Sequence, residues 1–488
     1  MFTANEVKRV HLVGIGGTAM AALAAMLQER GLLVSGSDQA IYPPMSDFLA
    51  QRRIPVMEGF SPQNLGPDLD LAVVGNAISR GNPELEALLE RRMPYRSFPE
   101  VLRAWFLEGK RSLVVAGTHG KTTTASLLSW ILLEAGEDPG FLVGGIPRGL
   151  EAGCRVGEGE LFVVEGDEYD TAFFDKRPKF LHYLPWVVTL GGIEYDHADI
   201  YHSMEQMLGA YRMLLRVVPG NGRLVFNMGD PHARLIAQDS PCPVVGCAVG
   251  QPAQWTADGI RVERARTIFR VLHHGLPVGE CQWALPGRHN VINGLLALAA
   301  AREAGVDTEL AIQAMCGFQG VRRRLEFLGE IGGVLLYDDF AHHPSAIRAG
   351  LSGLRELHPG ARLWAIFEPR SNSMCRRVFQ EELPRAFAQA DRVILAGVHR
   401  AERIPPGDRL DPQEVVQAIN GPTQEAWYIP RVQDIVAFVR DEAVPGDVLC
   451  VMSNGGFGGI QGLLMEALGA RGPGSGGNPK PHQARRNQ

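Results

Sequence analysis

The residues best suited to hold phosphate lie in the stretch VVAGTHGKTTTAS, where a lysine precedes three threonines. An apolar run that predicts a strand comes before it, and an apolar run that predicts a helix follows. Exposed backbone N–H groups and the helix dipole both favour an anion at such a junction. Only two residues separate Gly117 from Gly120, whereas the usual phosphate-binding loop has four between its glycines. An ordinary glycine turn capped by threonine is the alternative interpretation.

We predict that this loop binds the phosphates of ATP. Lys121 supplies a point charge for the β- and γ-phosphates, and Thr122 offers a hydroxyl group to Mg²⁺. A later stretch, PGRHNVINGLLALAA, places two asparagines three residues apart on one helix face. Their amides suit an adenine edge or a phosphate oxygen, and helix capping explains them equally well. The predicted ATP-binding residues are Gly117, Thr118, His119, Gly120, Lys121, Thr122, Thr123, Asn290 and Asn293.

Two acidic stretches each follow an apolar run that predicts a strand. Glu165 ends the first run, in LFVVEGDEYD, and Asp196 and His197 follow the second, in WVVTLGGIEYDHAD. In open α/β sheets, ligands gather at the carboxyl ends of the strands. Mg²⁺ prefers oxygen ligands, so one histidine among them is unusual. We expect the metal ligands to be Thr122, Glu165 and His197; helix capping and surface ion pairing are the alternative.

A second glycine turn lies near the N-terminus, in VKRVHLVGIGGTAMAAL. Its glycines match a dinucleotide-binding fingerprint, and Asp38 stands about twenty residues further on, where a ribose-reading acid is expected. Taken alone, this pattern favours NAD, but the same loop fits any diphosphate, including that of a UDP-sugar. Because a separate ATP-type loop is present, we expect a substrate diphosphate here. The predicted UDP-sugar-binding residues are Gly14, Gly16, Gly17, Thr18 and Asp38.

Composition and charge exclude several classes of protein. Of the 488 residues, 45% are hydrophobic and 21% charged, as is typical of a globular domain protein, and the net charge of −6 argues against a nucleic-acid-coating surface. The seven cysteines form no CxxC pair, which suggests neither a zinc site nor a disulfide framework and fits a reducing compartment. Because neither a signal peptide nor a membrane-spanning run is visible, we expect a cytoplasmic protein with no nucleic-acid or membrane partner.

Strand and helix patterns alternate along the chain, which predicts an α/β protein of three domains. We expect a Rossmann-like N-terminal domain over residues 1–108 and a central P-loop-type ATPase domain over residues 109–325. A Rossmann-like C-terminal domain is expected over residues 326–468. Residues 469–488 are rich in Gly and Pro and have no apolar period, which predicts a disordered tail.

The motifs together resemble those of the Mur ligases of bacterial cell-wall synthesis. GIGG, GTHGKTTT, EGDEYD, DHAD, HNVIN, RRRLE and YDDFAHHP occur in the order and at the spacing of that family, over about residues 8–465. The family's phosphate loop has the shorter form GT-x-GK-T/S, which accounts for the unusual spacing. One departure is that Gly191 and Gly192 stand where the family usually has an asparagine. No lysine follows at the place where some members carry a carbamoylated one, so none is assigned.

The resemblance implies ATP-driven amide synthesis through an acyl phosphate, with Mg²⁺ present. Arg324, the last arginine of RRRLE, and Asp339, the second aspartate of YDD, are expected to act from the C-terminal domain. A solvated basic turn is the alternative for the arginines. The residues expected to act in catalysis are Lys121, Glu165, His197, Arg324 and Asp339.

Two branches of the family share these motifs. One joins L-alanine to UDP-N-acetylmuramate, and the other attaches the recovered tripeptide L-alanyl-γ-D-glutamyl-meso-diaminopimelate in peptidoglycan recycling. AFFDKRPKF, EPRSNSM and VMSNGGFGGI resemble the second branch, so we expect the tripeptide and UDP-N-acetylmuramate as substrates. Arg370, Ser371 and Asn372 are expected to contact the tripeptide. The alternatives are the L-alanine ligase, a nicotinamide-dependent dehydrogenase, and a nucleotide-gated switch without chemistry.

Overall fold

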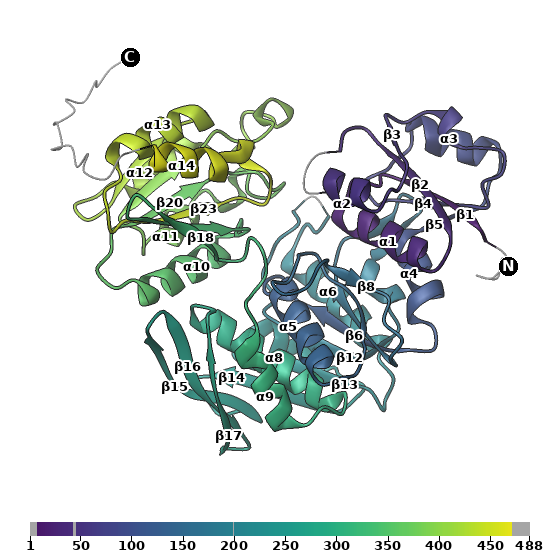
Figure 1. Cartoon of the computed structure of the whole chain (residues 1–488), viewed down its shortest axis with the longest axis horizontal. Coiled ribbons are helices and arrows are strands. Elements are labelled where there is room, and N and C mark those ends of the chain that lie inside the picture. The colour runs from purple at the N-terminus through teal and green to yellow at the C-terminus, as the bar shows by residue number, and fades with distance from the viewer. Residues whose placement is uncertain (1–6, 42–44, 199, 471–488) are drawn as a thin grey trace. The chain divides into compact units, whose positions relative to one another are not determined.

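The computed structural model describes residues 7–41, 45–198 and 200–470. The chain divides into two compact units, each of which is described by itself (Figure 1). The first contains residues 1–284 and 288–322, and the second contains residues 285–287 and 323–488. The predicted α/β class is confirmed, because each of the three large sheets is mainly parallel and its strands alternate with helices along the chain.

The first sheet is wholly parallel, with the order β3-β2-β1-β4-β5. Its strands are β1 (Arg9–Val13), β2 (Leu33–Asp38), β3 (Val56–Glu58), β4 (Leu71–Val74) and β5 (Tyr95–Ser97). The connecting helices are α1 (Thr18–Glu29), α2 (Met45–Gln51), α3 (Pro83–Glu90) and α4 (Phe98–Leu102), with the 3₁₀-helix η2 (Pro62–Asn64) and the π-helix η3 (Arg103–Leu107). The strand order reverses beside β1, which is the Rossmann-like arrangement predicted for this region and places a ligand crevice at the carboxyl end of β1.

The second sheet has the order β17-β16-β15-β14-β13-β12-β6-β9-β7-β8. Its strands are β6 (Arg111–Ala116), β7 (Gly140–Leu142), β8 (Cys154–Arg155), β9 (Leu161–Gly166), β12 (Pro185–Leu190), β13 (Arg223–Asn227), β14 (Val244–Val249), β15 (Trp255–Glu263), β16 (Arg266–His273) and β17 (Leu276–Trp283). The helices of this region are α5 (Lys121–Glu134), α6 (Met204–Arg216), α7 (Pro231–Ala237), α8 (Arg288–Glu303) and α9 (Thr308–Gly317). A small hairpin of β10 (Asp170–Ala172) and β11 (Asp175–Pro178) precedes the turn η4 (Lys179–His182).

The neighbours β12, β6 and β9 form the centre of this sheet. They pair in parallel and are apolar and buried at most positions, as expected for strands covered on both faces. All three therefore end at the same edge. This edge receives the residues after Ala116, the carboxylate of Glu165 and the segment after Leu190.

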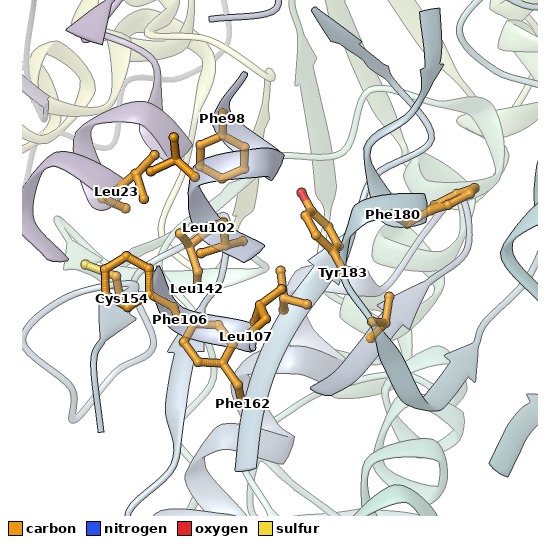
Figure 2. Packing of buried hydrophobic residues seen from close by; sticks show 14 of the residues in the cluster. Leu23, Phe98, Leu102, Phe106, Leu107, Leu142, Cys154, Phe162, Phe180 and Tyr183 are labelled. Atoms are coloured by element: carbon orange, nitrogen blue, oxygen red, sulfur yellow. The ribbon is translucent and has the colours of Figure 1, made fainter. Parts of the chain in front are cut away.

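One hydrophobic cluster links the first two sheets into the first unit (Figure 2). The short helix α4 is fixed by a capping box, in which Ser97 and Glu100 each accept a hydrogen bond from the other's backbone N–H. Figure 2 shows buried side chains of α1, α4 and η3 packed with those of the second sheet: Leu23, Phe98, Leu102, Phe106, Leu107, Leu142, Cys154 and Phe162. Burial of each large apolar side chain contributes about 2 kcal/mol, so this shared cluster stabilises the packing of the two sheets within the first unit. The domain boundaries stay a prediction.

The second unit contains the third sheet, with the order β18-β19-β23-β20-β21-β22. Its strands are β18 (Glu326–Ile331), β19 (Val334–Asp339), β20 (Leu363–Phe367), β21 (Arg392–Leu395), β22 (Glu425–Tyr428) and β23 (Val448–Met452), and all pairs except β18–β19 are parallel. The helices are α10 (Pro344–Leu357), α11 (Leu383–Ala386), α12 (Pro412–Ile419), α13 (Val432–Glu442) and α14 (Ile460–Gly469), with the turns η5 (Arg377–Phe379), η6 (Ala401–Arg403) and η7 (Phe457–Gly459). Two clusters cover the two faces, one including α10 and the other including α13 and α14 (Figure 1).

The predicted tail was expected to begin at residue 469. Helix α14 still includes Gly469, and residues 471–488 lie outside the described part of the chain. Within the described ranges, every helix is too short or too polar to cross a lipid bilayer.

Candidate active site

The predicted phosphate loop joins β6 directly to α5, as the sequence pattern indicated. Gly117 and Gly120 both take positive φ angles, 122° and 78°, which a residue with a Cβ atom adopts only at a cost. Gly120 is the N-cap of α5, and no side chain caps the helix there. The first backbone N–H groups of α5 therefore remain available to an anion, and the helix dipole favours one.

Lys121 is the first residue of α5 and lies in a row of three buried charged groups. Its Nζ is 2.8 Å from Glu168 Oε2, and His197 Nε2 is 3.0 Å from Glu168 Oε1. The Glu168 side chain is fully buried, whereas those of Lys121 and His197 are 12% and 11% exposed. The structure thus brings together two predicted catalytic residues through a third that we did not predict.

Neighbouring charges and hydrogen bonds oppose the effect of burial on the pKa of each group in the row. Burial alone would raise the pKa of Glu168, but Lys121 and the hydrogen bond from His197 lower it to about 2. Burial opposes a charged Lys121, yet Glu168 and Asp167 hold its pKa above the usual value. Burial likewise opposes a charged His197, and the hydrogen bond to Glu168 raises the pKa of this imidazole. Lys121 therefore stays protonated although it is largely buried, and it supplies a positive charge at the start of α5.

Thr122 and Glu165 form a second pair at this edge. Thr122 Oγ1 donates to Glu165 Oε2 over 3.2 Å, and the backbone N–H of Gly144 donates to the other carboxylate oxygen. A hydroxyl and a carboxylate oxygen side by side are ligands that Mg²⁺ prefers. His197 differs, because Nε2 is hydrogen-bonded to Glu168; only Nδ1 of the ring is then suited to a metal, and metal-bound histidines commonly have such a carboxylate partner. These residues fit a magnesium ion.

The Gly191–Gly192 departure has a structural role of its own. Backbone hydrogen bonds join Gly191 N to the Ala116 carbonyl and Thr118 N to the Gly192 carbonyl. A Cβ atom on Gly117 would lie 3.1 Å from Gly191 N and from Gly192 O, so the two segments are in close backbone contact. The loop is therefore held by main chain where the family usually has an asparagine.

Glu194 attaches to the same loop and was not predicted as a site residue. The hydroxyl of Thr118 donates to the Glu194 carbonyl over 3.0 Å and accepts from its N–H over 2.9 Å. The Glu194 carboxylate lies 3.0 Å from His119 Nε2. Two of the predicted ATP-binding residues thus hold the loop to the segment that follows β12.

Both predicted asparagines lie inside α8, so neither is its N-cap. They are buried, and Asn293 Nδ2 donates to Asn290 Oδ1 over 3.4 Å. A Cβ atom on Gly120 would overlap Asn293 Oδ1. Asn293 therefore contacts the phosphate loop itself, which favours the nucleotide-binding interpretation over capping.

The N-terminal glycine turn is tied to β2. Gly14 and Ile15 donate their backbone N–H groups to the Ser37 carbonyl, and Gly16 donates to Asp38 Oδ2 over 2.8 Å. A Cβ atom on Gly16 would meet the same carboxylate oxygen at 2.8 Å, which explains the glycine. Helix α1 begins at Thr18 and has no side-chain cap. The uncapped turn suits a diphosphate, whereas one oxygen of Asp38 is already occupied by the loop.

Beneath this turn lies a buried polar group that sequence reasoning missed. Glu84 of α3 is fully buried and accepts hydrogen bonds from Ser37 Oγ and Asn64 Nδ2, and His11 Nε2 lies 3.6 Å away. Burial opposes its charge, but these hydrogen bonds hold the pKa of Glu84 below the usual value. The network fixes β1, β2 and α3 around the turn.

The predicted residues of the C-terminal region lie in the second unit. Asp339 ends β19 and is buried; burial raises the pKa of its carboxyl group to about 6, although the charge of Arg324 acts in the opposite direction. The Arg324 guanidinium lies over the Phe340 ring, 4.7 Å from its centroid. His343 caps α10 through Ser345, so this histidine has a structural role.

The predicted tripeptide residues lie near the ends of β20 and β23. Arg370 is 3.6 Å from Glu368, whose other carboxylate oxygen accepts from Ser453 Oγ over 2.5 Å. Arg323 donates to the Ser453 and Gly455 carbonyls over 2.7 Å each. The residues that sequence reasoning missed here are Arg323, Glu368 and Ser453, although each stands in a motif that it had singled out: RRRLE, EPRSNSM and VMSNGGFGGI.

Family models match three successive regions of the chain. Residues 9–109 match the Mur ligase family catalytic domain, residues 115–301 the Mur ligase middle domain, and residues 323–455 the Mur ligase glutamate ligase domain. The order agrees with the three sheets described above.

Individual relatives are similar to this protein over nearly the whole chain. A ligase of Escherichia coli, named UDP-N-acetylmuramate–L-alanyl-γ-D-glutamyl-meso-2,6-diaminoheptandioate ligase, is 41% identical over 94% of this chain and 98% of its own. UDP-N-acetylmuramate–L-alanine ligase of Methylobacillus flagellatus is 34% identical over 95% of this chain and 97% of its own. The crystal structure of a murein peptide ligase of Psychrobacter arcticus has a TM-score of 0.72 at 34% identity, over 95% of this chain and 99% of its own. The chain belongs to the Mur ligase family, whose members are ATP-dependent ligases that form amide bonds.

Proposed function

We propose that this chain joins L-alanyl-γ-D-glutamyl-meso-diaminopimelate to UDP-N-acetylmuramate, with ATP as the energy source, in peptidoglycan recycling. The single observation that carries the chemistry is the buried row Lys121–Glu168–His197 beside Thr122 and Glu165, at the edge where the phosphate loop opens. The choice of substrate rests on the relative of Escherichia coli, whose name gives these two substrates.

The proposed reaction overcomes the poor reactivity of a carboxylate toward an amine. A carboxylate oxygen of the muramic acid attacks the γ-phosphorus of ATP, ADP leaves, and an acyl phosphate forms. The amine of the tripeptide then attacks the carbonyl carbon, the C–O bond to phosphate breaks, and the nitrogen loses a proton. Because the first step brings two anions together, the site must supply positive charge. Lys121, held ionised by Glu168, supplies it.

Magnesium is proposed to lie beside Thr122, Glu165 and His197. When bound, it would neutralise phosphate charge and orient the phosphate oxygens. The oxygen donors of Thr122 and Glu165 fit this ion, and the hydrogen bond from Glu168 orients the His197 ring.

The remaining roles follow the three matched regions. We assign UDP-sugar binding to residues 1–108, with the turn of Gly14, Gly16, Gly17 and Thr18, to which Asp38 is joined. ATP binding is assigned to residues 109–325 and amine-substrate binding to residues 326–468. Arg324 and Asp339 are proposed to act in catalysis, and Arg370, Ser371 and Asn372 to bind the tripeptide. All seven cysteines are free, which agrees with a cytoplasmic setting.

Phosphate release tests this proposal. The protein receives ATP, Mg²⁺ and UDP-N-acetylmuramate, and then either the tripeptide or L-alanine. We expect rapid phosphate release with the tripeptide and at least about tenfold slower release with L-alanine. Without the UDP-sugar, we expect no phosphate release with either amine. A preference for L-alanine would overturn the substrate choice, and release without any amine would overturn the ligase reaction.

The L-alanine ligase is the second candidate, because the relative of Methylobacillus flagellatus with that name is 34% identical over nearly the whole chain. The dehydrogenase is disfavoured, because it gives no role to the second glycine loop, Glu165 or His197, and because all three matched regions belong to Mur ligase models. Failure of NADH fluorescence to change on addition of the protein would dismiss it.

A further inference from the structure

Two cysteines of the first unit belong to β17 and α9, which pack against each other. Along β17, Cys281 and Trp283 are buried while Glu280 and Gln282 are exposed, as expected when alternate side chains point to opposite faces. A Cβ atom on Gly279 would lie 2.9 Å from Ile312 Cδ1 of α9. Gly279 and Cys281 share one face of the strand, so the Cys281 thiol points toward α9.

The same face is closed on its other side by α8. The Trp283 ring lies against Gly294 of α8, where Met315 of α9 also reaches. Cys281 is therefore enclosed between Ile312 on one side and Trp283 on the other, and its exposed fraction is 0%. The position of its side chain is fixed by these neighbours.

Cys316 approaches from α9. It stands one helical turn after Ile312, so both point to the same face of the helix. Its sulfur lies 3.9 Å from the Glu280 carbonyl, which is the backbone group next to Cys281. The two thiols are close enough for each to shift the pKa of the other. Unlike Cys281, Cys316 is partly exposed, so a small oxidant can reach it.

The surroundings favour the reactive form of one thiol. The Cys281 side chain, together with the backbone N–H of Gln282, lowers the pKa of Cys316 to about 6, although burial acts in the opposite direction. The charge of Arg266 contributes in the same sense. Burial raises the pKa of Cys154 and of Cys375 to about 11, so those two thiols remain protonated. Since the thiolate is the nucleophile, Cys316 differs from both in reactivity.

We propose that Cys281 and Cys316 form a reversible oxidation site for a peroxide. The Cys316 thiolate attacks one peroxide oxygen, the O–O bond breaks, and hydroxide leaves to become water, which gives a sulfenic acid at Cys316. The Cys281 sulfur then attacks the Cys316 sulfur, the S–O bond breaks, and a second water forms with the Cys281 proton. The cysteines are oxidised to a disulfide, and the peroxide is reduced to two waters. A thiol reductant reverses the reaction.

The bond would fasten α9 to the sheet. Helix α9 also holds α5, because Trp130 Nε1 donates to the Ala314 carbonyl over 2.9 Å and the Trp130 ring packs against Phe318. A cross-link from β17 to α9 closes a loop that contains all of α8, which restricts the unfolded chain. We expect the oxidised protein to melt at a higher temperature than the reduced one. The proposal does not depend on the assigned ligase reaction.

Peptide mapping tests it on the intact protein. The reduced protein is treated with a small excess of hydrogen peroxide under native conditions, its free thiols are blocked, and its peptides are analysed by mass spectrometry. We expect a linked Cys281–Cys316 pair, lost on treatment with dithiothreitol, and a melting temperature that rises with the linked fraction. Absence of the linked pair in wild type, or a pair that appears only after denaturation, would overturn the site.

Variants assign the two roles. Cys281→Ser removes the resolving thiol, so dimedone should label Cys316 after peroxide treatment. Cys316→Ser should abolish both the link and the label. Cys154→Ser is the matched control, because its thiol is also buried but lies in β8, and the link should form as in wild type. Equal dimedone labelling of several cysteines in Cys281→Ser would overturn the assignment to Cys316.

Discussion

At the residue scale, Glu168 holds Lys121 in place and keeps it protonated. A fully buried carboxylate with the Lys121 cation on one side and the His197 imidazole on the other is stable only while both partners remain. Lys121 is also the residue that a triphosphate would contact. On the proposed function, the same three side chains would determine both local stability and the charge that faces a bound phosphate.

We predict that Glu168→Gln destabilises the first unit by about 3 kcal/mol, because Lys121 would be left as a buried charge without its carboxylate. ADP release should fall by at least about 100-fold, since the lysine is no longer held ionised and in place. Thermal unfolding and a coupled ADP assay measure the two effects.

The control is Glu160→Gln. Glu160 is 83% exposed and lies 3.4 Å from Arg111, and a surface pair of this kind contributes at most about 1 kcal/mol. Equal behaviour of the two variants would contradict the role given to Glu168.

A second residue-scale prediction concerns pH. The pKa of Asp339 rises from 3.8 to about 6 in the folded protein because the carboxyl is buried. A raised carboxyl pKa means that its contribution to stability is fully present below pH 3.8 and is lost as the pH rises through about 6. A rise of about two units corresponds to about 3 kcal/mol lost by pH 7.

Asp339→Asn removes this titration. Relative to wild type, we expect the melting temperature of the variant to rise progressively between pH 3.8 and about pH 6, with little further gain at higher pH. Asp258→Asn, at an exposed pair with Arg270, should show no such trend. A difference between Asp339→Asn and wild type that is the same at every pH would contradict the shifted pKa.

At the element scale, the two ends of α5 offer a matched comparison. Gly120 and Gly136 take nearly equal φ angles, 78° and 79°, so alanine costs each about 1 kcal/mol of backbone strain. At Gly120 the new Cβ atom would overlap the Asn293 side chain, whereas at Gly136 nothing lies within 4 Å.

We predict that Gly120→Ala weakens ATP binding at least about tenfold, since either the loop or Asn293 must move. Gly136→Ala should lose similar stability and bind ATP normally. Calorimetric titration with a non-hydrolysable ATP analogue measures the affinity. Normal binding by both variants would show that the loop geometry is not required.

The elements themselves were largely predictable from sequence. The strands around Leu113, Phe162 and Val187 are apolar runs bounded by turns, and the helices after the glycine turns follow from composition. Lys121, Thr122 and Glu165 were predictable because each stands where a parallel strand meets a loop. Short strands such as β7 and β8 were not predictable, because their sequences have no distinct pattern.

Contacts between distant segments were the part that sequence could not give. Glu168 stands in a motif that we had noted, but only folding brings it between Lys121 and His197. The expected ribose-reading Asp38 turned out to hold the Gly16 N–H, which depends on the exact loop path. Likewise, the scattered cysteines suggested no pairing, because Cys281 and Cys316 meet only when α9 packs on β17.

At the scale of the whole molecule, the first unit holds two separate glycine turns, one before α1 and one before α5, and neither helix has a side-chain cap. If each serves its own ligand, a change in one should leave the other intact. We predict that Lys121→Ala lowers turnover by at least about 100-fold while the affinity for UDP-N-acetylmuramate stays within about twofold of wild type. Calorimetric titration with UDP-N-acetylmuramate measures this affinity. Loss of both properties in a folded variant would mean that the two turns do not act separately.

The transfer of oxygen tests the ligase reaction most directly. UDP-N-acetylmuramate labelled with ¹⁸O in its carboxylate is incubated with ATP, Mg²⁺ and the tripeptide, and the released phosphate is analysed by mass spectrometry. An acyl phosphate requires that each phosphate carry one carboxylate oxygen, so we expect one ¹⁸O atom per phosphate formed. Phosphate without the label, released at the rate of amide formation, would contradict the reaction proposed for this chain.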